Sequence, residues 1–215
     1  MASIEPRLSN YEITKQQTAK LFLKYDQENM IKKFQLRHDT DYLYIKFLEH
    51  EYRIHRMSGK ITWSNDNFAT FTEAGYNEAM TIYDVLCYSK KDCHTAGEFV
   101  NMKSLSAIQG GSPALCKGMF QKTEQLFDHK NAALSRACER LNGCKAGRGD
   151  IAYQIPVFDF LPFLFQFWNS DEEFPASLQL FTDKNILQYM HYETVWYAAS
   201  HLLTRLEEEL SDHSS

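Results

Sequence analysis

Apolar side chains in the first part of the chain recur with helical spacing. Ser9 or Asn10 can cap a helix at its start. The apolar residues that follow, up to Leu36, share one stripe: Ala19, Phe22, Leu23, Met30, Ile31 and Phe34. Side chains three and four residues apart lie on the same face of a helix. The pattern therefore predicts one amphipathic helix over residues 9–36.

From Asp41 onward, apolar side chains alternate with their neighbours, which is the spacing of a strand with one buried face. The alternating runs cover residues 42–47, 51–55 and 61–63, and Ser58-Gly59 separates the last two. A glycine-containing turn between alternating runs is a hairpin signal. The segment predicts an antiparallel β-meander, in which His50 and His55 face opposite sides because their positions differ in parity.

Three further helical segments are predicted. Residues 73–89 place apolar side chains on one face, and residues 192–209 do the same near the end of the chain. Another helix ends at Leu141-Asn142-Gly143, where Gly143 can take the left-handed conformation that closes a helix.

The second half of the chain also contains three strand-like runs, at residues 151–158, 163–168 and 178–181. Pro156 and Pro162 have no amide proton to donate, so we expect these runs to be edge strands or to be broken near the prolines.

Separate groups of antiparallel strands and helices predict the α+β class. We expect an antiparallel β-meander and a second group of strands, packed with about four helices. No repeat or linker divides the chain. We therefore expect a single domain over residues 1–210, with residues 211–215 as a frayed tail.

The composition is that of a globular protein, with 44% hydrophobic and 24% charged residues among 215. The net charge of −5 argues against nucleic-acid binding, which needs clustered basic side chains. The N-terminus lacks the apolar region of a secretory signal, and the apolar stretch 155–168 is too short and interrupted to span a membrane. Five cysteines, an odd number, fit reduced thiols. We expect a soluble, cytoplasmic protein.

Signatures of common cofactors and metals are absent. There is no GxGxxG, P-loop, HExxH or CxxC motif. Cys87 with Cys93-His94, and Cys138 with Cys144, are six positions apart, which is not the usual spacing of zinc or iron–sulfur ligands. The eight histidines are scattered without a carboxylate at a recognisable spacing. We expect no cofactor.

Two segments are candidate sites. At Gly110, Gly111 and Ser112, followed by Pro113, backbone amides at the start of a helix can face an anion, or the glycines can simply turn the chain.

The second candidate is acidic. Asp150, Asp171 and Glu173 can converge on a divalent cation while Glu172 turns away, since alternate residues of an extended segment share a side. The competing interpretation is that these acids are solvated or capped by backbone amides in a turn.

Aromatic residues make up 14% of the chain and concentrate in one stretch: Phe158, Phe160, Phe163, Phe165, Phe167 and Trp168. The main interpretation is core packing. The alternative is that they line an apolar ligand pocket or a subunit interface.

The C-terminal half resembles a known family. The features are Gly149-Asp150, the aromatic strands with prolines, the segment Asp171–Pro175 and the run Leu180–Asp183 before a terminal helix. They are similar to the bacterial and archaeal domain-of-unknown-function family 3786, and the resemblance extends over about residues 41–206. The run Phe181-Thr182-Asp183 departs from the usual Phe-Asp of the family.

The resemblance implies a fold and a domain extent but no activity. Some members of the family are joined to a four-cysteine iron–sulfur module of the kind found in corrinoid proteins, which implies a neighbourhood in anaerobic one-carbon or redox metabolism. This sequence lacks that module.

Two classes of function remain. The first is a module that binds a small ligand or a partner protein without chemistry of its own, which is favoured because no nucleophile, base and orienting group can be placed together. The alternative is a carboxylate-based, divalent-metal-dependent enzyme using the acidic segment. We expect no nucleic-acid or membrane partner, and a homo-oligomer remains open.

The purified protein should be colourless and contain no stoichiometric iron, zinc or cobalamin, because its cysteines and histidines lack ligand spacing. Elemental analysis of protein never exposed to a metal-affinity column checks this. A metal-to-protein ratio near one would contradict it.

Overall fold

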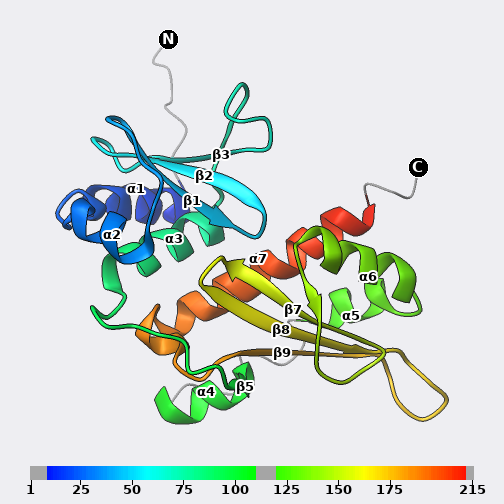
Figure 1. The fold of residues 1–215 in the computed structure, drawn as a ribbon. Coiled ribbons are helices and arrows are strands. Elements are labelled where there is room, and N and C mark those ends of the chain that lie inside the picture. The colour runs from blue at the N-terminus through cyan, green and yellow to red at the C-terminus, as the bar shows by residue number, and fades with distance from the viewer. Residues whose placement is uncertain (1–8, 110–119, 212–215) are drawn as a thin grey trace.

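The computed structural model describes residues 9–109 and 120–211, and it contains two antiparallel sheets and the helices around them (Figure 1). The elements of the first half are α1 (Asn10–Phe22), α2 (Gln27–Phe34), β1 (Tyr42–Phe47), β2 (His50–His55), β3 (Ile61–Ser64), β4 (Thr72–Glu73), α3 (Tyr76–Tyr88), β5 (Phe99–Asn101) and α4 (Met102–Gln109). Those of the second half are α5 (Gln121–Phe127), α6 (Asn131–Arg140), β6 (Cys144–Lys145), β7 (Ile151–Phe158), β8 (Leu161–Trp168), β9 (Ser177–Asp183), the short 3-10 helix η2 (Ile186–Gln188) and α7 (Tyr192–Ser211).

The first sheet has the order β1-β2-β3-β4, with every neighbouring pair antiparallel, so the predicted meander is confirmed. Its inner face carries Leu43, Ile45, Tyr52 and Ile54, all buried. His50 lies opposite the buried Phe47, and His55 lies opposite Tyr42 on the outer face. The two histidines therefore face opposite sides, as their parity predicts.

The expectation of one helix over residues 9–36 is wrong, because the chain forms α1 and α2 with a break at residues 23–26. Ser9 caps α1 through a bond from the amide of Glu12, as predicted. The break is produced by Asp26, whose carboxylate accepts a hydrogen bond from the amide of Asn29 and so caps a second helix start. The apolar stripe continues across the break because both helices pack on the same core.

The second sheet has the order β5-β9-β8-β7-β6, and its three long strands match the predicted runs. We expected these runs to be edge strands or to be broken near the prolines. They are not edge strands, but the pairing is irregular next to Pro156, as the second alternative predicts. Pro156 and Pro162 lie opposite each other in two interior strands, next to a register shift between Pro156 and Phe158. Pairing of β8 with β9 begins only at Phe163, and β6 pairs only with Tyr153 and Gln154. The missing amides therefore fall where neither strand has a second neighbour.

The end of α6 corrects another prediction. Asn142, with φ 57°, takes the left-handed conformation that we assigned to Gly143. The amide of Gly143 donates to the Cys138 carbonyl at 2.9 Å, and a Cβ at residue 143 would lie 2.6 Å from that oxygen. Glycine is thus required there for close approach rather than for its backbone angle.

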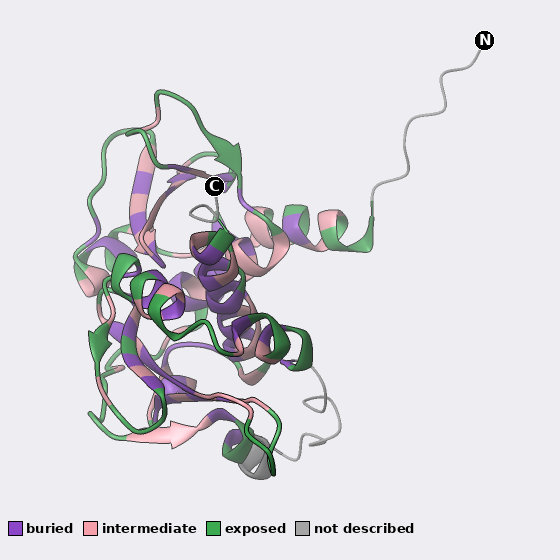
Figure 2. Ribbon diagram, turned by 90° about the vertical axis from the view of Figure 1, so that its right-hand side faces the viewer, coloured by how far each residue is buried: buried purple, intermediate pink, exposed green. Residues whose placement is uncertain are grey.

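The aromatic stretch is mainly core, as predicted. Phe158, Phe163, Phe165 and Phe167 are buried. They belong to one continuous hydrophobic cluster that includes residues of both sheets and of α7. Figure 2 shows the buried residues gathered in the middle of the molecule, with exposed ones on the outer turns.

The helix α7 packs against α3, below the first sheet, and against α6, beside the second. Among the described residues, no helix is long and apolar enough to cross a membrane.

The turn between β1 and β2 joins the two halves. Leu48 and Glu49 both have positive φ, 49° and 64°, which is unfavourable for residues other than glycine or asparagine. The Leu48 amide donates to the Val157 carbonyl of β7 at 3.0 Å. The Leu48 carbonyl faces the Arg205 Nε of α7 at 3.5 Å. Contacts with both the second sheet and α7 therefore hold this turn.

Two glycines with the same backbone angle allow a matched test of close packing. Gly59 and Gly97 both have φ 72°, but a Cβ at residue 59 would lie 2.4 Å from the Ala19 carbonyl oxygen, whereas one at residue 97 would meet nothing within 4 Å. Both Gly59→Ala and Gly97→Ala should lose about 1 kcal/mol to the left-handed backbone.

Gly59→Ala should lose about 2 kcal/mol more, because the hairpin must move away from α1. Urea denaturation of both variants measures the difference. Equal losses would show that backbone strain alone matters at residue 59.

Candidate functional site

A groove follows the contact between the C-terminal end of α2 and the turn between β7 and β8. It consists of a cavity of about 490 Å³ and an adjoining one of about 290 Å³, which share Phe34, Gln35, Asp159 and Phe160. The larger cavity is also lined by Lys33, Cys93 and Tyr189, and the smaller one by Leu36, Arg37, Tyr44, Ile45, Lys46 and Glu51. We call the two together the Phe160 groove.

The walls of the groove are formed by the end of α2 and by the hairpin turn between β7 and β8. Gln35 ends α2 in the left-handed conformation, φ 52°, which turns the chain away directly after Phe34. Asp159 and Phe160 form the two-residue turn of the hairpin, since Phe158 pairs with Leu161. A large aromatic residue is unusual in such a turn. Phe160 is half-buried there, with one part of its surface open to the groove.

Aromatic rings form a near-parallel series from the core to the groove. Phe47 stacks on Phe158 with ring centroids 4.7 Å apart, and Phe158 lies 5.4 Å from Phe160 at an interplanar angle of 4°. Phe160 then contacts Phe34 at 4.7 Å and Tyr189 at 5.9 Å. Because Phe34 and Tyr189 line the larger cavity, the series ends at the space where a ligand would lie.

The polar groups in the larger cavity are mostly satisfied by the protein. The Lys33 Nζ donates to the carbonyl and the hydroxyl of Ser89, at 2.9 and 2.7 Å, and lies 5.1 Å from the centroid of the Phe34 ring. Burial raises the pKa of the Cys93 thiol, and the neighbouring Lys33 only partly opposes this effect. Burial also raises the pKa of Tyr189 to about 12, with a smaller contribution from Cys93. Cys93 is therefore a protonated thiol at neutral pH rather than a nucleophile.

Two cations that line the smaller cavity form ion pairs with acidic residues of the protein. Arg37 pairs with Glu51, and its guanidinium lies 3.7 Å from the Tyr44 ring centroid. Lys46 pairs with Glu49 at 2.7 Å. Asp159, which lines both cavities, has no hydrogen-bond or ion-pair partner among the described residues.

The sequence-predicted anion site, Gly110, Gly111 and Ser112, lies outside the described residues.

Two of the predicted acidic residues, Asp150 and Asp171, accept hydrogen bonds from nearby amides. The Asp150 carboxylate accepts hydrogen bonds from the backbone amide and the side-chain amide of Asn169, at 2.8 and 3.0 Å. The Asp171 carboxylate accepts from the amides of Glu173 and Phe174, which lower its pKa, the amide of Phe174 more strongly. Capping by backbone amides, the competing interpretation, thus accounts for Asp171.

Asp150, Asp171 and Glu173 do not form a metal-binding group. Across residues 9–109 and 120–211, no cluster of three or more histidine, cysteine, aspartate or glutamate side chains is placed to hold a metal ion.

Two histidines have carboxylate partners that the sequence spacing did not reveal. The His191 Nδ1 lies 2.7 Å from the Asp84 carboxylate, which also accepts the His191 backbone amide. The His201 Nε2 lies 3.7 Å from the Glu78 carboxylate. Each pair is separated by more than a hundred residues in the chain, so only tertiary packing brings it together.

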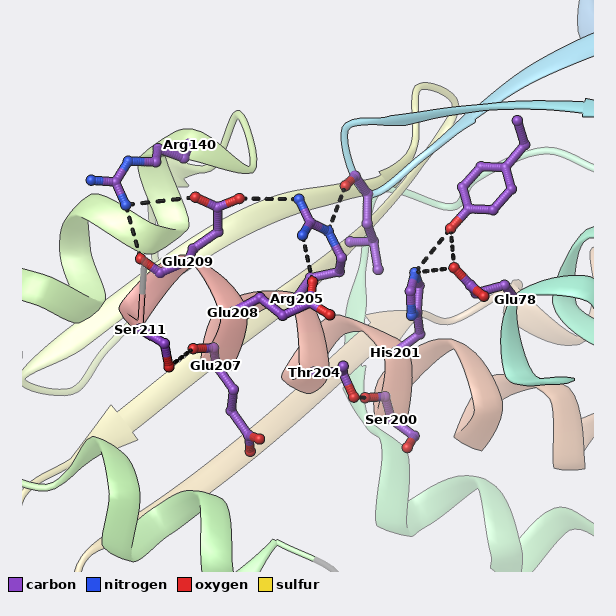
Figure 3. A network of polar contacts seen from close by, with 12 residues as sticks. Glu78, Arg140, Ser200, His201, Thr204, Arg205, Glu207, Glu208, Glu209 and Ser211 are labelled. Atoms are coloured by element: carbon purple, nitrogen blue, oxygen red, sulfur yellow. Dashed lines mark hydrogen bonds and ion pairs between the residues drawn. The ribbon is translucent and has the colours of Figure 1, made fainter. Parts of the chain in front are cut away.

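The environment of His201 is a buried network rather than an open site (Figure 3). The Tyr52 hydroxyl donates to Glu78 at 2.5 Å and lies 3.3 Å from the His201 Nε2. On the next turn of α7, Arg205 pairs with Glu208 at 2.6 Å and with Glu209 at 3.1 Å. Tyr52, His201 and Arg205 are all buried. The network therefore joins β2, α3 and α7, and its members Tyr52, His201 and Arg205 are shielded from solvent.

Sequence reasoning identified Phe160 only as part of the aromatic stretch, and it missed the other walls of the groove. One available signal was the aromatic side chain next to Asp159 in a segment between two strand-like runs. Phe34 carried no such signal, because its position on the apolar stripe of a helix is equally typical of a core residue.

Comparisons with known proteins identify a family but no activity. The family model described as Domain of unknown function (DUF3786) matches residues 26–205. No curated protein and no solved structure matches the chain.

The protein should lose stability as the pH falls from about 6.5 toward 3, in part because of His201. Burial, assisted by Arg205 and His50, lowers the pKa of His201 to about 3. Its unfolded pKa is about 6.5, so within this window the unfolded state binds more protons. At pH 5 the contribution of His201 should be a loss of about 2 kcal/mol relative to pH 7.

Urea denaturation at pH 7 and pH 5 measures this loss. His201→Gln should reduce the difference between the two pH values, whereas His55→Gln, on the outer face of the first sheet, should leave it unchanged. The readout is the pH dependence, because either substitution can lower stability at both pH values. An undiminished difference in His201→Gln would refute the assignment.

Proposed function

Because the chain belongs to the DUF3786 family, for which no function is established, we propose from the Phe160 groove that it binds a small planar ligand without chemistry of its own. The observation that carries this proposal is the series of near-parallel rings that runs from the core and ends at Phe34 and Tyr189 in an open cavity. A planar ligand would continue this series, since offset stacking between aromatic rings is favourable by about 0.5–1.5 kcal/mol beyond the burial of area.

The size of the groove supports a small molecule. Ligand sites usually have volumes of about 300–1,000 Å³, with aromatic and apolar walls and a few polar groups that orient the ligand. The larger cavity, at about 490 Å³, lies within that range. Its walls combine three rings with Gln35, Lys33 and Asp159.

The rigidity of the walls also supports binding. Phe160 belongs to a hairpin turn between two long strands of the second sheet, and it packs on the buried Phe158. Lys33 is held by two hydrogen bonds to Ser89. A site formed before the ligand arrives loses less conformational entropy on binding.

The protonated state of Cys93 supports binding rather than catalysis in this groove. Cys93 is the one nucleophilic thiol among the described lining residues, and burial raises its pKa, so the thiolate is scarce at neutral pH.

The variant Phe34→Leu tests the proposal, because it retains apolar volume and removes one ring from the end of the series. Indole is a suitable planar probe, and its binding can be followed by amide chemical-shift changes in isotope-labelled protein. We expect shifts at groove residues in the parent protein and about fivefold weaker binding in Phe34→Leu, the loss of one aromatic contact.

Phe174→Leu is the matched control, since Phe174 is 66% exposed and lies outside the groove. It should bind indole like the parent. Shifts confined to residues outside the groove, or equal affinity in both variants, would overturn the proposal. Native mass spectrometry of freshly purified protein should in addition reveal any ligand carried through purification.

A further inference from the structure

We infer that the ligand of the Phe160 groove carries a protonated nitrogen, such as an amine or an amidine, that pairs with the Asp159 carboxylate. This inference rests on the proposed function and specifies the chemical class of the ligand. The charged groups of the groove are the basis for it: the lining cations already have contacts within the protein, and Asp159 has none among the described residues.

Asp159 is the unpaired acid of the groove. It lines both cavities, and none of the described residues donates a hydrogen bond to its carboxylate or forms an ion pair with it. The other acid in the lining, Glu51, is paired with Arg37. Three other aspartates near the second sheet, Asp128, Asp150 and Asp171, each accept backbone amides. Asp159 therefore differs from them, because it is an exposed residue in the lining of two cavities and its carboxylate has no partner among the described residues.

The cations of the groove already have partners. Lys33 donates to two oxygen atoms of Ser89, the backbone carbonyl and the side-chain hydroxyl. Those contacts use two of the three protons of the ammonium group. Arg37 and Lys46 are paired with Glu51 and Glu49. The acid without a partner in the groove is thus Asp159, while each lining cation already has a contact within the protein.

The aromatic walls favour the same sign of charge. The face of an aromatic ring attracts cations, and two cations of the protein already use this contact, Lys33 over Phe34 and Arg37 over Tyr44. A ligand amine that reaches a ring face left open by these contacts gains from that ring and from Asp159, while a ligand anion is disfavoured by both.

Lys33 carries the positive charge in the lining of the larger cavity, opposite in sign to Asp159. A ligand amine is repelled by Lys33, so its binding depends on the Asp159 carboxylate. If that carboxylate is removed, Lys33 remains without a nearby unpaired acid in the lining, and the preference of the groove should change from cations to anions.

Three indole derivatives of similar size test the sign of the charge. They are tryptamine, which is a cation at neutral pH, indole-3-ethanol, which is neutral, and indole-3-acetate, which is an anion. Affinities are measured by titration calorimetry and by amide chemical shifts at low salt. We expect tryptamine to bind about tenfold tighter than indole-3-ethanol, and indole-3-acetate to bind weakest.

Asp159→Asn should abolish the advantage of tryptamine and make indole-3-acetate the tighter of the two charged probes. Asp159→Glu should restore the preference for tryptamine. Asp41→Asn, which removes one negative charge from an exposed position outside the groove, should retain the order of the parent protein.

The outcomes separate this inference from the proposed function. If the three probes bind at the groove with equal affinity, or if Asp159→Asn does not change their order, the cation assignment is wrong while binding of planar ligands stands. If none of the probes shifts groove residues, the proposed function fails and the inference fails with it.

Discussion

The buried guanidinium of Arg205 is the constraint on which the rest of the structure depends. Only 7% of this residue is exposed. A buried charge is tolerated only when it is paired and hydrogen-bonded, because its removal from water is otherwise unfavourable by several kcal/mol. Arg205 meets this requirement with Glu208 and Glu209 on its own helix and with the Leu48 carbonyl of the β1–β2 turn. The contact places the first sheet at a defined position on α7, and the Leu48 amide then places the same turn on β7.

The position of that turn determines where the groove lies. Because Leu48 is held against Val157, the preceding residue Phe47 can stack on Phe158, and the ring series continues outward to Phe160. The opposite wall comes from α2, which exists as a separate helix because Asp26 starts it and Gln35 ends it. The Phe160 groove is therefore a consequence of how two sheets and a short helix are joined, and its walls come from segments that lie far apart in the sequence.

Acidic residues in this protein show how one residue type takes different roles according to its surroundings. In the β8–β9 connection, aspartate side chains accept backbone amides and stabilise a turn, as Asp171 does. Asp84 accepts the backbone amide of His191 at the start of α7, and it also orients the imidazole. Asp159 stands in a turn as well, but it is exposed, lines two cavities and has no described partner for its carboxylate. The physical difference is the supply of nearby amide donors, which depends on the backbone path and not on the acid itself.

The sequence by itself determined the α+β class, the meander, the three long strands and the terminal helix, since periodicity follows directly from which face of each element is buried. It did not reveal the break between α1 and α2, because the apolar stripe is continuous across Asp26 while the cap depends on a local hydrogen bond. It predicted an irregularity near Pro156, which the register shift confirms, but it did not reveal that both prolines lie in interior strands, where their tolerance depends on the length of the neighbouring strands. The Phe160 groove was decided by tertiary structure alone. Its rings are brought together from distant segments, and a phenylalanine has the same hydrophobic pattern in the sequence whether its ring fills a core or ends at a cavity.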